Sequence, residues 1–293
     1  MTDNITMCII PDFAAVSAWC VSLAFGLTLL ALASGIYFVF NRLEKIFKTA
    51  LFFLGGAVLF QAAAFAALTL FFWYVPENRY LTPVNTSRGM VLALGFCINA
   101  LLLGLEMRRG TGITFVFVLP WSLLLLAITL FSAAPGLEAF SLQARSPLSA
   151  VHNFLFMVSY AMFINAFGAS FSLLLSDREL RGRIPHEAAF ALPSIGDMDR
   201  LIWRLVEVGF PLFSAGFILA SIQLYAKYSR LPGSDVKELG AIATLLVYGI
   251  YLVLRKYGDW RGTKAAWANV AGFIFIAATM VLSSRLIAYH KFF

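Results

Sequence analysis

Charged residues are scarce in this chain of 293 residues: they make up 13% of the sequence, whereas hydrophobic residues make up 61%. Because soluble domains usually carry about 25% charged residues, the composition excludes an ordinary soluble protein. The net charge of +7 is positive, but the basic residues are spread over many loops and form no single patch of the kind that binds nucleic acid. We therefore expect a membrane protein without a nucleic-acid partner.

Cysteine and histidine are also few, with three residues of each. Cys8, Cys20 and Cys97 form no CxxC or CxxCH motif, which argues against a disulfide framework and against covalent c-type haem attachment. The first 13 residues contain no lysine or arginine, so they do not resemble a cleaved signal peptide. No hydrophilic stretch is long enough to fold alone, and we expect a single membrane domain over residues 1–293.

Long apolar runs, in contrast, are abundant. Eight of them approach or exceed the length of about 20 residues that a helix needs to cross a bilayer. They cover residues 13–40, 48–75, 88–107, 112–133, 148–176, 205–227, 238–254 and 266–289. Continuous runs such as residues 123–126 (LLLL) do not alternate apolar and polar side chains, which excludes a membrane β-barrel. The sequence therefore predicts an all-α, polytopic membrane helix bundle with about eight transmembrane helices.

The loops between these runs differ in positive charge. Fourteen lysines and arginines lie in the loops after the first, third, fifth and seventh runs, against seven on the opposite side. Because positively charged loops remain in the cytoplasm, we expect a multi-pass protein of the inner (cytoplasmic) membrane with both termini on the outer side. Within the cytoplasmic segment 176–204, Ser194 and Asp197 predict the start of an amphipathic helix that leads into the sixth span.

Two of the three histidines lie near the predicted outer face. His152 is about one turn inside the fifth run, and His290 is at the outer end of the eighth. Two imidazoles from separate helices can ligate a haem iron, although a histidine near a helix end is more often a structural or interfacial residue. Arg285 is costly within the membrane unless it snorkels to the headgroups or pairs with an anion. The residues alone leave these alternatives open.

Several motifs follow one another in the second half of the chain. They are residues 152–161 (HNFLFMVSYA), 192–194 (LPS), 198–201 (MDRL), 209–212 (GFPL), 248–252 (YGIYL) and 259–262 (DWRG), and finally His290. In this order and spacing they resemble the CcsA-type cytochrome c assembly family. The resemblance covers about residues 148–293, whereas residues 1–147 hold four divergent helices that match only in hydropathy.

The resemblance implies that residues 148–293 form a haem-handling half. In that half His152 and His290 would ligate a non-covalent haem b near the outer face, for cytochrome c maturation or haem delivery. Arg285, Arg230 and Lys227 would be candidates for binding the haem propionates. The implied partners are another membrane protein or a c-type cytochrome. The chain would have no catalytic activity of its own but would belong to a cytochrome c haem-lyase system.

The chain also departs from the family pattern at two places. The family has a tryptophan-rich outer loop where residues 227–238 contain no tryptophan, and its membrane-embedded histidine falls at about Val253. A haem entry site on the cytoplasmic side is therefore unsupported. These departures keep two alternatives open: an anchoring or electron-relay subunit of a larger respiratory-type complex, and a membrane regulator of haem synthesis.

Overall fold

The computed structural model describes the backbone of every residue except 1, 42, 75–81, 132–146, 182–193, 234–235 and 291–293. It describes side chains over the same residues except 2–12, 228, 237 and 279–290. Within this described part the chain is helical and contains no strand, which confirms the predicted all-α bundle.

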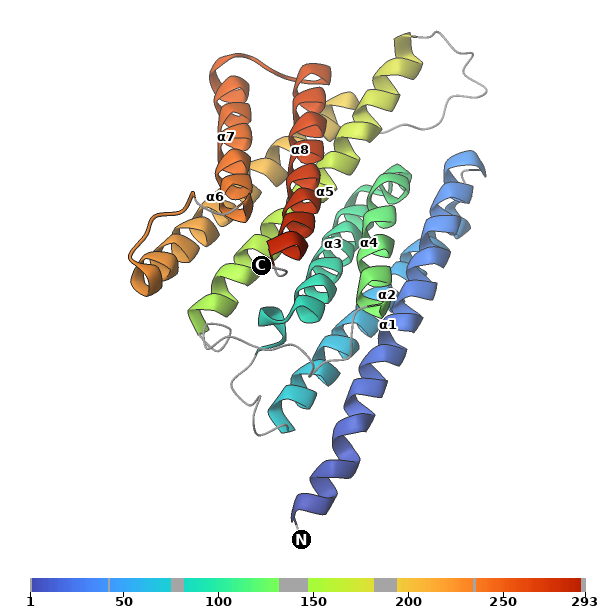
Figure 1. Cartoon of the computed structure of the whole chain (residues 1–293). Helices are drawn as coiled ribbons and strands as arrows, with labels where there is room; N and C mark the ends of the chain where they lie inside the picture. The colour runs from blue at the N-terminus through green and yellow to red at the C-terminus, as the bar shows by residue number, and fades with distance from the viewer. Residues whose placement is uncertain are drawn as a thin grey trace. The chain divides into compact units, whose positions relative to one another are not determined.

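Eight α-helices and a short 3-10 helix follow one another along the described chain (Figure 1). They are α1 (Thr2–Asn41), α2 (Glu44–Tyr74), η2 (Pro83–Asn85), α3 (Ser87–Arg109), α4 (Ile113–Phe131), α5 (Pro147–Arg181), α6 (Ile195–Tyr228), α7 (Val236–Tyr257) and α8 (Thr263–His290). The helices α1 to α7 each contain a stretch long and apolar enough to cross a membrane, and the described side chains of α8 form a shorter apolar segment, Thr263–Ala278. The protein is therefore a multi-pass membrane protein.

Some helices extend beyond the apolar runs from which they were predicted. The helix α6 begins at Ile195, whereas its apolar run begins at residue 205. Its N-cap is Ser194, whose hydroxyl accepts a hydrogen bond from the Asp197 N–H at 3.0 Å and donates to the Asp197 carboxylate at 2.6 Å. Such a cap satisfies donors that the first turn leaves unpaired. The predicted amphipathic helix is therefore the first part of α6.

The chain divides into two compact units, Met1–Ala161 and Met162–Phe293, and the division falls within α5. In the first unit α1 packs against α2 and α4, and α3 packs against the same two helices (Figure 1). A buried cluster joins these four helices, with two residues from α1 and one from each of the others: Val21, Ala24, Ala64, Leu92 and Leu126. Small residues such as the two alanines let helix backbones approach closely within a membrane.

Polar groups inside the first unit are paired between helices and at a helix end. The Asn99 amide in α3 donates to Gln61 Oε1 in α2 at 3.1 Å. The buried Glu106 carboxylate near the end of α3 accepts hydrogen bonds from the Gly112 N–H and from the hydroxyls of Thr111 and Thr114. It therefore satisfies donors around the start of α4, which would otherwise lack partners in an apolar environment.

The later part of α5 supplies the core of the second unit. Phe163 stacks on Tyr248 of α7 with ring centroids 4.0 Å apart, and Phe167 contacts Phe273 of α8 at 4.5 Å. The Asn269 amide in α8 donates to the Ser170 hydroxyl at 2.9 Å. The helix α7 also packs against α6 and α8. One continuous helix thus contributes its first turns to one unit and its remaining turns to the other.

Candidate functional site

The start of α5 is tied to the start of α3 within the first unit. The Asn153 amide, in the second turn of α5, donates to the Val84 carbonyl at 3.2 Å and to Asn85 Oδ1 at 3.0 Å. Both acceptors belong to η2, which directly precedes α3. The two helices therefore begin at the same end of this unit, and residues of their first turns share that end.

His152 is the neighbour of Asn153 at this end. Its imidazole is half-buried and meets the Phe156 ring edge-to-face, with centroids 5.9 Å apart and planes at 86°. Its Nδ1 is buried and makes no hydrogen bond of normal geometry with a described residue; the Leu148 backbone lies near the ring but outside that geometry. A ring nitrogen beside the backbone of its own helix leaves the other ring nitrogen for a ligand, as in metal-binding histidines.

Arg88, in the first turn of α3, is the second polar residue at this end. The residue is 8% exposed, and its Nε makes no hydrogen bond with any described residue. No ion pair with Arg88 is present in the described part of the chain either. By sequence Arg88 is one of the seven cations on the predicted outer side, and nothing in the sequence signals that an arginine beside an apolar run is buried.

The local fold explains why Arg88 occupies a fixed position. Thr86 is the N-cap of α3: its hydroxyl accepts a hydrogen bond from the Gly89 N–H at 3.0 Å and donates to the Pro83 carbonyl at 2.8 Å. Gly89 lies so close to the same carbonyl that a Cβ at this position would overlap its oxygen. The turn of η2 therefore packs directly on the first turn of α3 and fixes its backbone.

The second predicted haem ligand lies in the other unit. His290 is the last residue of α8 and Arg285 lies five residues before it, both in the second unit. Their side chains lie outside the described residues. Ligation of one haem by His152 and His290 therefore stays a prediction, as does the role of Arg285.

The remaining two predicted residues lie at the end of α6. Lys227 is exposed in the last turn of that helix. Arg230 follows the helix, and its two terminal nitrogens donate to the two carboxylate oxygens of Glu238, at 3.0 and 2.8 Å. The Gly233 N–H also donates to Glu238, at 2.8 Å. This set of contacts, the Arg230–Glu238 clasp, holds the connection between α6 and α7 at the place where the family has its tryptophan-rich loop.

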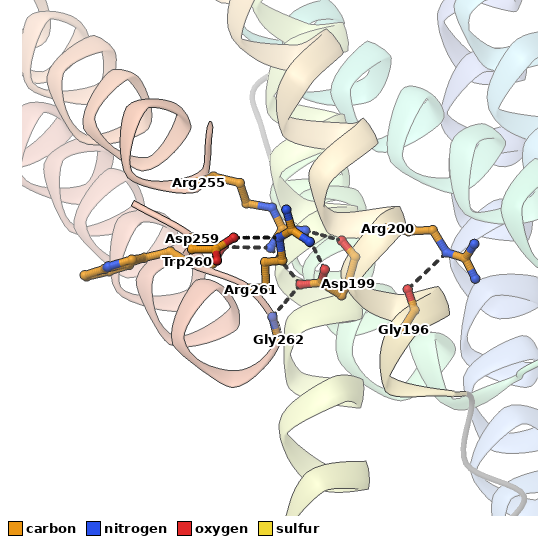
Figure 2. Close-up of polar contacts among 8 residues, drawn as sticks. All are labelled: Gly196, Asp199, Arg200, Arg255, Asp259, Trp260, Arg261 and Gly262. Carbon is orange, nitrogen blue, oxygen red and sulfur yellow. Dashed lines mark hydrogen bonds and ion pairs between the residues drawn. The ribbon is translucent and has the colours of Figure 1, made fainter. Parts of the chain in front are cut away.

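Two of the motifs that carry the family resemblance meet within the second unit (Figure 2). Arg255 near the end of α7 donates to both carboxylate oxygens of Asp199, at 2.7 and 2.6 Å, and to the carbonyls of Asp199 and Trp260. The Gly262 N–H donates to Asp199 at 2.7 Å. The Arg255 guanidinium also lies 5.5 Å from the Trp203 ring centroid. Asp199 of the MDRL motif therefore connects α6 with the DWRG loop between α7 and α8.

Comparison with known proteins agrees with this reading of the motifs. The chain matches the family model described as "Cytochrome C assembly protein" over residues 90–288. The match begins well before residue 148, so it also includes most of α3 and all of α4, which the sequence analysis linked to the family only through hydropathy.

Individual relatives point the same way. The chain is 29% identical to the "Cytochrome c biogenesis protein CcsA" of Parasynechococcus marenigrum over 171 residues, which is 51% of this chain and 55% of that protein. It is 27% identical to the protein of the same name from Chlamydomonas reinhardtii over 167 residues, or 45% of that protein. The match to the Prochlorococcus marinus protein is 26% over 286 residues and spans 88% of this chain and 87% of that protein.

The chain thus spans about half the length of the first two relatives and most of the third. The family model covers more than half of the chain, and all three relatives carry the same name. This multi-pass membrane protein belongs to the cytochrome c assembly protein family, and its relatives are of the CcsA type.

Proposed function

We propose that this protein binds haem b at the end of the bundle where α5 begins and that it takes part in cytochrome c assembly. Family membership supports the role. The observation that supports the site is the half-buried His152 imidazole, whose buried Nδ1 has only the Leu148 backbone as a nearby partner in the described part of the chain. Histidine is a common axial ligand of haem iron. His290, at the end of α8, is the proposed second ligand.

The residues around His152 fit a binding role. The Phe156 ring restricts the imidazole from one side, and the hydrogen bonds of Asn153 to η2 hold the helix that carries it. A ligand held in one orientation loses less conformational freedom on binding. When bound, the haem supplies the porphyrin that apocytochrome c accepts. The protein's own contribution is to bind it, orient it and keep it at the membrane surface.

The propionates of the haem need cationic partners. Arg285 and Lys227 are proposed partners in the second unit. Arg230 is already in a bidentate ion pair with Glu238, so it could serve only by exchanging that carboxylate for a propionate.

We further propose that the protein lies in the inner membrane with both termini outside, which rests on the fourteen-to-seven division of loop cations. Labelling from outside should then reach a cysteine placed at residue 234 but not one placed at residue 182.

The absorption spectrum of the protein, purified in mild detergent, tests the proposed function. We expect a low-spin, b-type spectrum in the wild type, and a high-spin spectrum or loss of pigment in His152→Ala, because the iron would lose one axial ligand. His186→Ala is the matched control, since His186 lies in the predicted cytoplasmic segment, and it should leave the spectrum unchanged. A wild-type protein that takes up no added haem would contradict the proposal, as would a low-spin spectrum in His152→Ala.

One observation favours a second candidate function, an anchoring or electron-relay subunit of a larger membrane complex. The connection between α6 and α7 is held by the Arg230–Glu238 clasp and contains no tryptophan. It therefore lacks the flat aromatic surface on which a porphyrin could be presented to a partner. A deletion strain separates the two functions. Loss of all c-type cytochromes would support assembly, whereas loss of one membrane complex with intact c-type cytochromes would support the subunit.

A further inference from the structure

The least expected feature of the first unit is a buried arginine that has no anion among the described residues. We propose that Arg88 binds a carboxylate, and that this carboxylate is a propionate of the haem; the second half of this statement rests on the proposed function. Arg88 would then bind the same ligand as His152, and both residues belong to one compact unit. The sequence alone assigns no such role to Arg88.

The first argument is electrostatic. Arg88 is 8% exposed, and neither an ion pair nor a hydrogen bond of its Nε is present among the described residues. A guanidinium remains protonated in proteins and cannot avoid burial by losing its charge. A buried charge without a partner is strongly unfavourable, and arginines near a membrane interior mark ligand or ion sites for this reason. Burial without an anion among the described residues therefore calls for an anion from elsewhere, and a ligand can supply it.

The second argument is position. Arg88 belongs to the turn in which Thr86 caps Gly89, and this turn continues into η2. Asn85 of η2 in turn accepts a hydrogen bond from Asn153, the neighbour of His152. The chain neighbours of the proposed iron ligand and of the buried arginine, Asn153 and Gly89, are thus both hydrogen-bonded to the short segment 84–86. A ligand that carries both a metal and carboxylates matches a site that offers an imidazole and a guanidinium at one end of one unit.

The third argument is chemical fit. The planar guanidinium presents paired N–H donors that match the two oxygens of a carboxylate. In the second unit both comparable arginines of the described part already have such a carboxylate: Glu238 binds Arg230, and Asp199 binds Arg255. Arg88 has the same donors and no such partner in that part of the chain. The guanidinium of Arg88 therefore suits one propionate of a haem whose iron is bound by His152 of the same unit.

The competing anion is an acidic side chain of this protein. Glu77 and Glu138 lie in the segments 75–81 and 132–146, outside the described residues, and both segments are predicted to lie on the same side of the membrane as Arg88. If either glutamate pairs with Arg88, the arginine is a structural residue. A test must therefore distinguish a propionate from a glutamate of the chain itself.

Haemin and haemin dimethyl ester, in which both propionates are esterified, provide this distinction. The purified full-length protein in detergent is titrated with each compound and binding is followed by absorption. We expect the wild type to prefer haemin by about tenfold to a hundredfold, the usual effect of a charge-assisted hydrogen-bonded pair. Arg88→Met should lose most of this preference, and Arg88→Lys should keep part of it. Arg261→Met, which removes an exposed arginine of the second unit, should retain the full preference.

Thermal unfolding of the haem-free protein supplies the second readout. If the anion comes from the ligand, haem-free Arg88→Met should be at least as stable as the haem-free wild type, because an unpaired buried charge has been removed. If the anion is Glu77 or Glu138, then Arg88→Met and the corresponding Glu→Gln variant should each lower the melting temperature, and the double variant should be no worse than either. That result would overturn the proposal.

Equal binding of haemin and its ester by the wild type, or an unchanged preference in Arg88→Met, would overturn it as well. In both cases binding that still depends on His152 would leave the proposed function standing. A wild-type protein that takes up neither compound would remove the proposed function and the role of Arg88 together.

Discussion

Two arginines of this protein have largely buried side chains but opposite surroundings. The side chain of Arg255 is 8% exposed and donates four hydrogen bonds, two of them to the Asp199 carboxylate (Figure 2). Arg88 is also 8% exposed, and its Nε has no partner in the described chain. The role of a buried arginine therefore depends on its acceptors. Arg255 holds α6, α7 and the DWRG loop together, whereas the Nε of Arg88 has no acceptor among the described residues and is proposed to face a ligand.

The two arginines also differ in their relation to the family match, which covers residues 90–288 and so includes Arg255 but not Arg88. Around Arg255 the resemblance is carried by short motifs, and the structure explains them as parts of one contact between Asp199, Arg255 and Gly262. Around Arg88 the sequence contains no comparable motif.

The largest expected effect is on the Arg255 contact. Asp199→Asn leaves the buried guanidinium without a carboxylate, and we expect a loss of about 3 kcal/mol in the free energy of unfolding. The value is at the lower end for a broken buried pair because the amide oxygen still accepts one hydrogen bond. Thermal or denaturant unfolding of the purified protein in detergent measures the loss.

Asp259→Asn is the matched control for this variant. The side chain of Asp259 is 86% exposed in its ion pair with Arg261, and asparagine tolerates the left-handed backbone at this position (φ 55°). It should change stability by less than about 0.5 kcal/mol. Equal losses in the two variants would contradict a structural role of the Asp199–Arg255 pair.

The next effect concerns the turn that places Arg88. In Gly89→Ala the new Cβ overlaps the Pro83 carbonyl oxygen, so η2 must move away from α3. We expect a loss of about 1–3 kcal/mol in stability, the usual cost of overpacking. The preference for haemin over its ester should also fall, because Arg88 moves with the turn. Melting curves and the haemin titration give the two readouts.

Gly104→Ala in the same helix is the control for this change. A Cβ at Gly104 meets no atom within 4 Å, and alanine is the better helix former by up to about 1 kcal/mol. The variant should be neutral or slightly stabilising. If Gly89→Ala behaves in the same way, then η2 does not fix the start of α3, and the position argument for Arg88 fails.

Much of the fold follows from the sequence because hydrophobicity alone determines it. Each apolar run became a helix, since a chain in a bilayer must satisfy its backbone internally. The cap at Ser194 was also predictable, because its serine and aspartate are three residues apart. The start of α1 at Thr2 was not predictable from the runs, since residues 2–12 include polar residues and a proline.

The candidate site could be predicted only in part. His152 stands out in a chain with three histidines, so rarity together with the family motif identifies it. The burial of Arg88 depends on how η2 packs against α3, and the Asp199–Arg255 pair joins residues 56 positions apart. Neither relationship produces a local pattern in the sequence. Tertiary packing therefore decides which of the many cations are buried, and the sequence supplies only their number and their side of the membrane.

The smallest expected effect concerns Arg230, which is intermediate between the two buried arginines. Its side chain is 38% exposed and it is paired with Glu238 through two hydrogen bonds. Because a partly exposed ion pair contributes little, Arg230→Gln should lower stability by about 1 kcal/mol or less. Glu238→Gln should have a similar or slightly larger effect, since Glu238 also accepts the Gly233 N–H. The double variant should be little worse than either single variant.

Haemin titration of Arg230→Gln then tests whether an arginine that is already paired with a carboxylate contributes to haemin affinity. A guanidinium that is committed to Glu238 has little to offer a propionate, so we expect the affinity for haemin to change by no more than about twofold, and the preference over the ester to persist. A loss of affinity near that expected for Arg88→Met would mean that the clasp opens when haem binds. In that case a carboxylate already present beside an arginine would not prevent that arginine from binding a ligand, and the contrast between Arg255 and Arg88 would lose its predictive value.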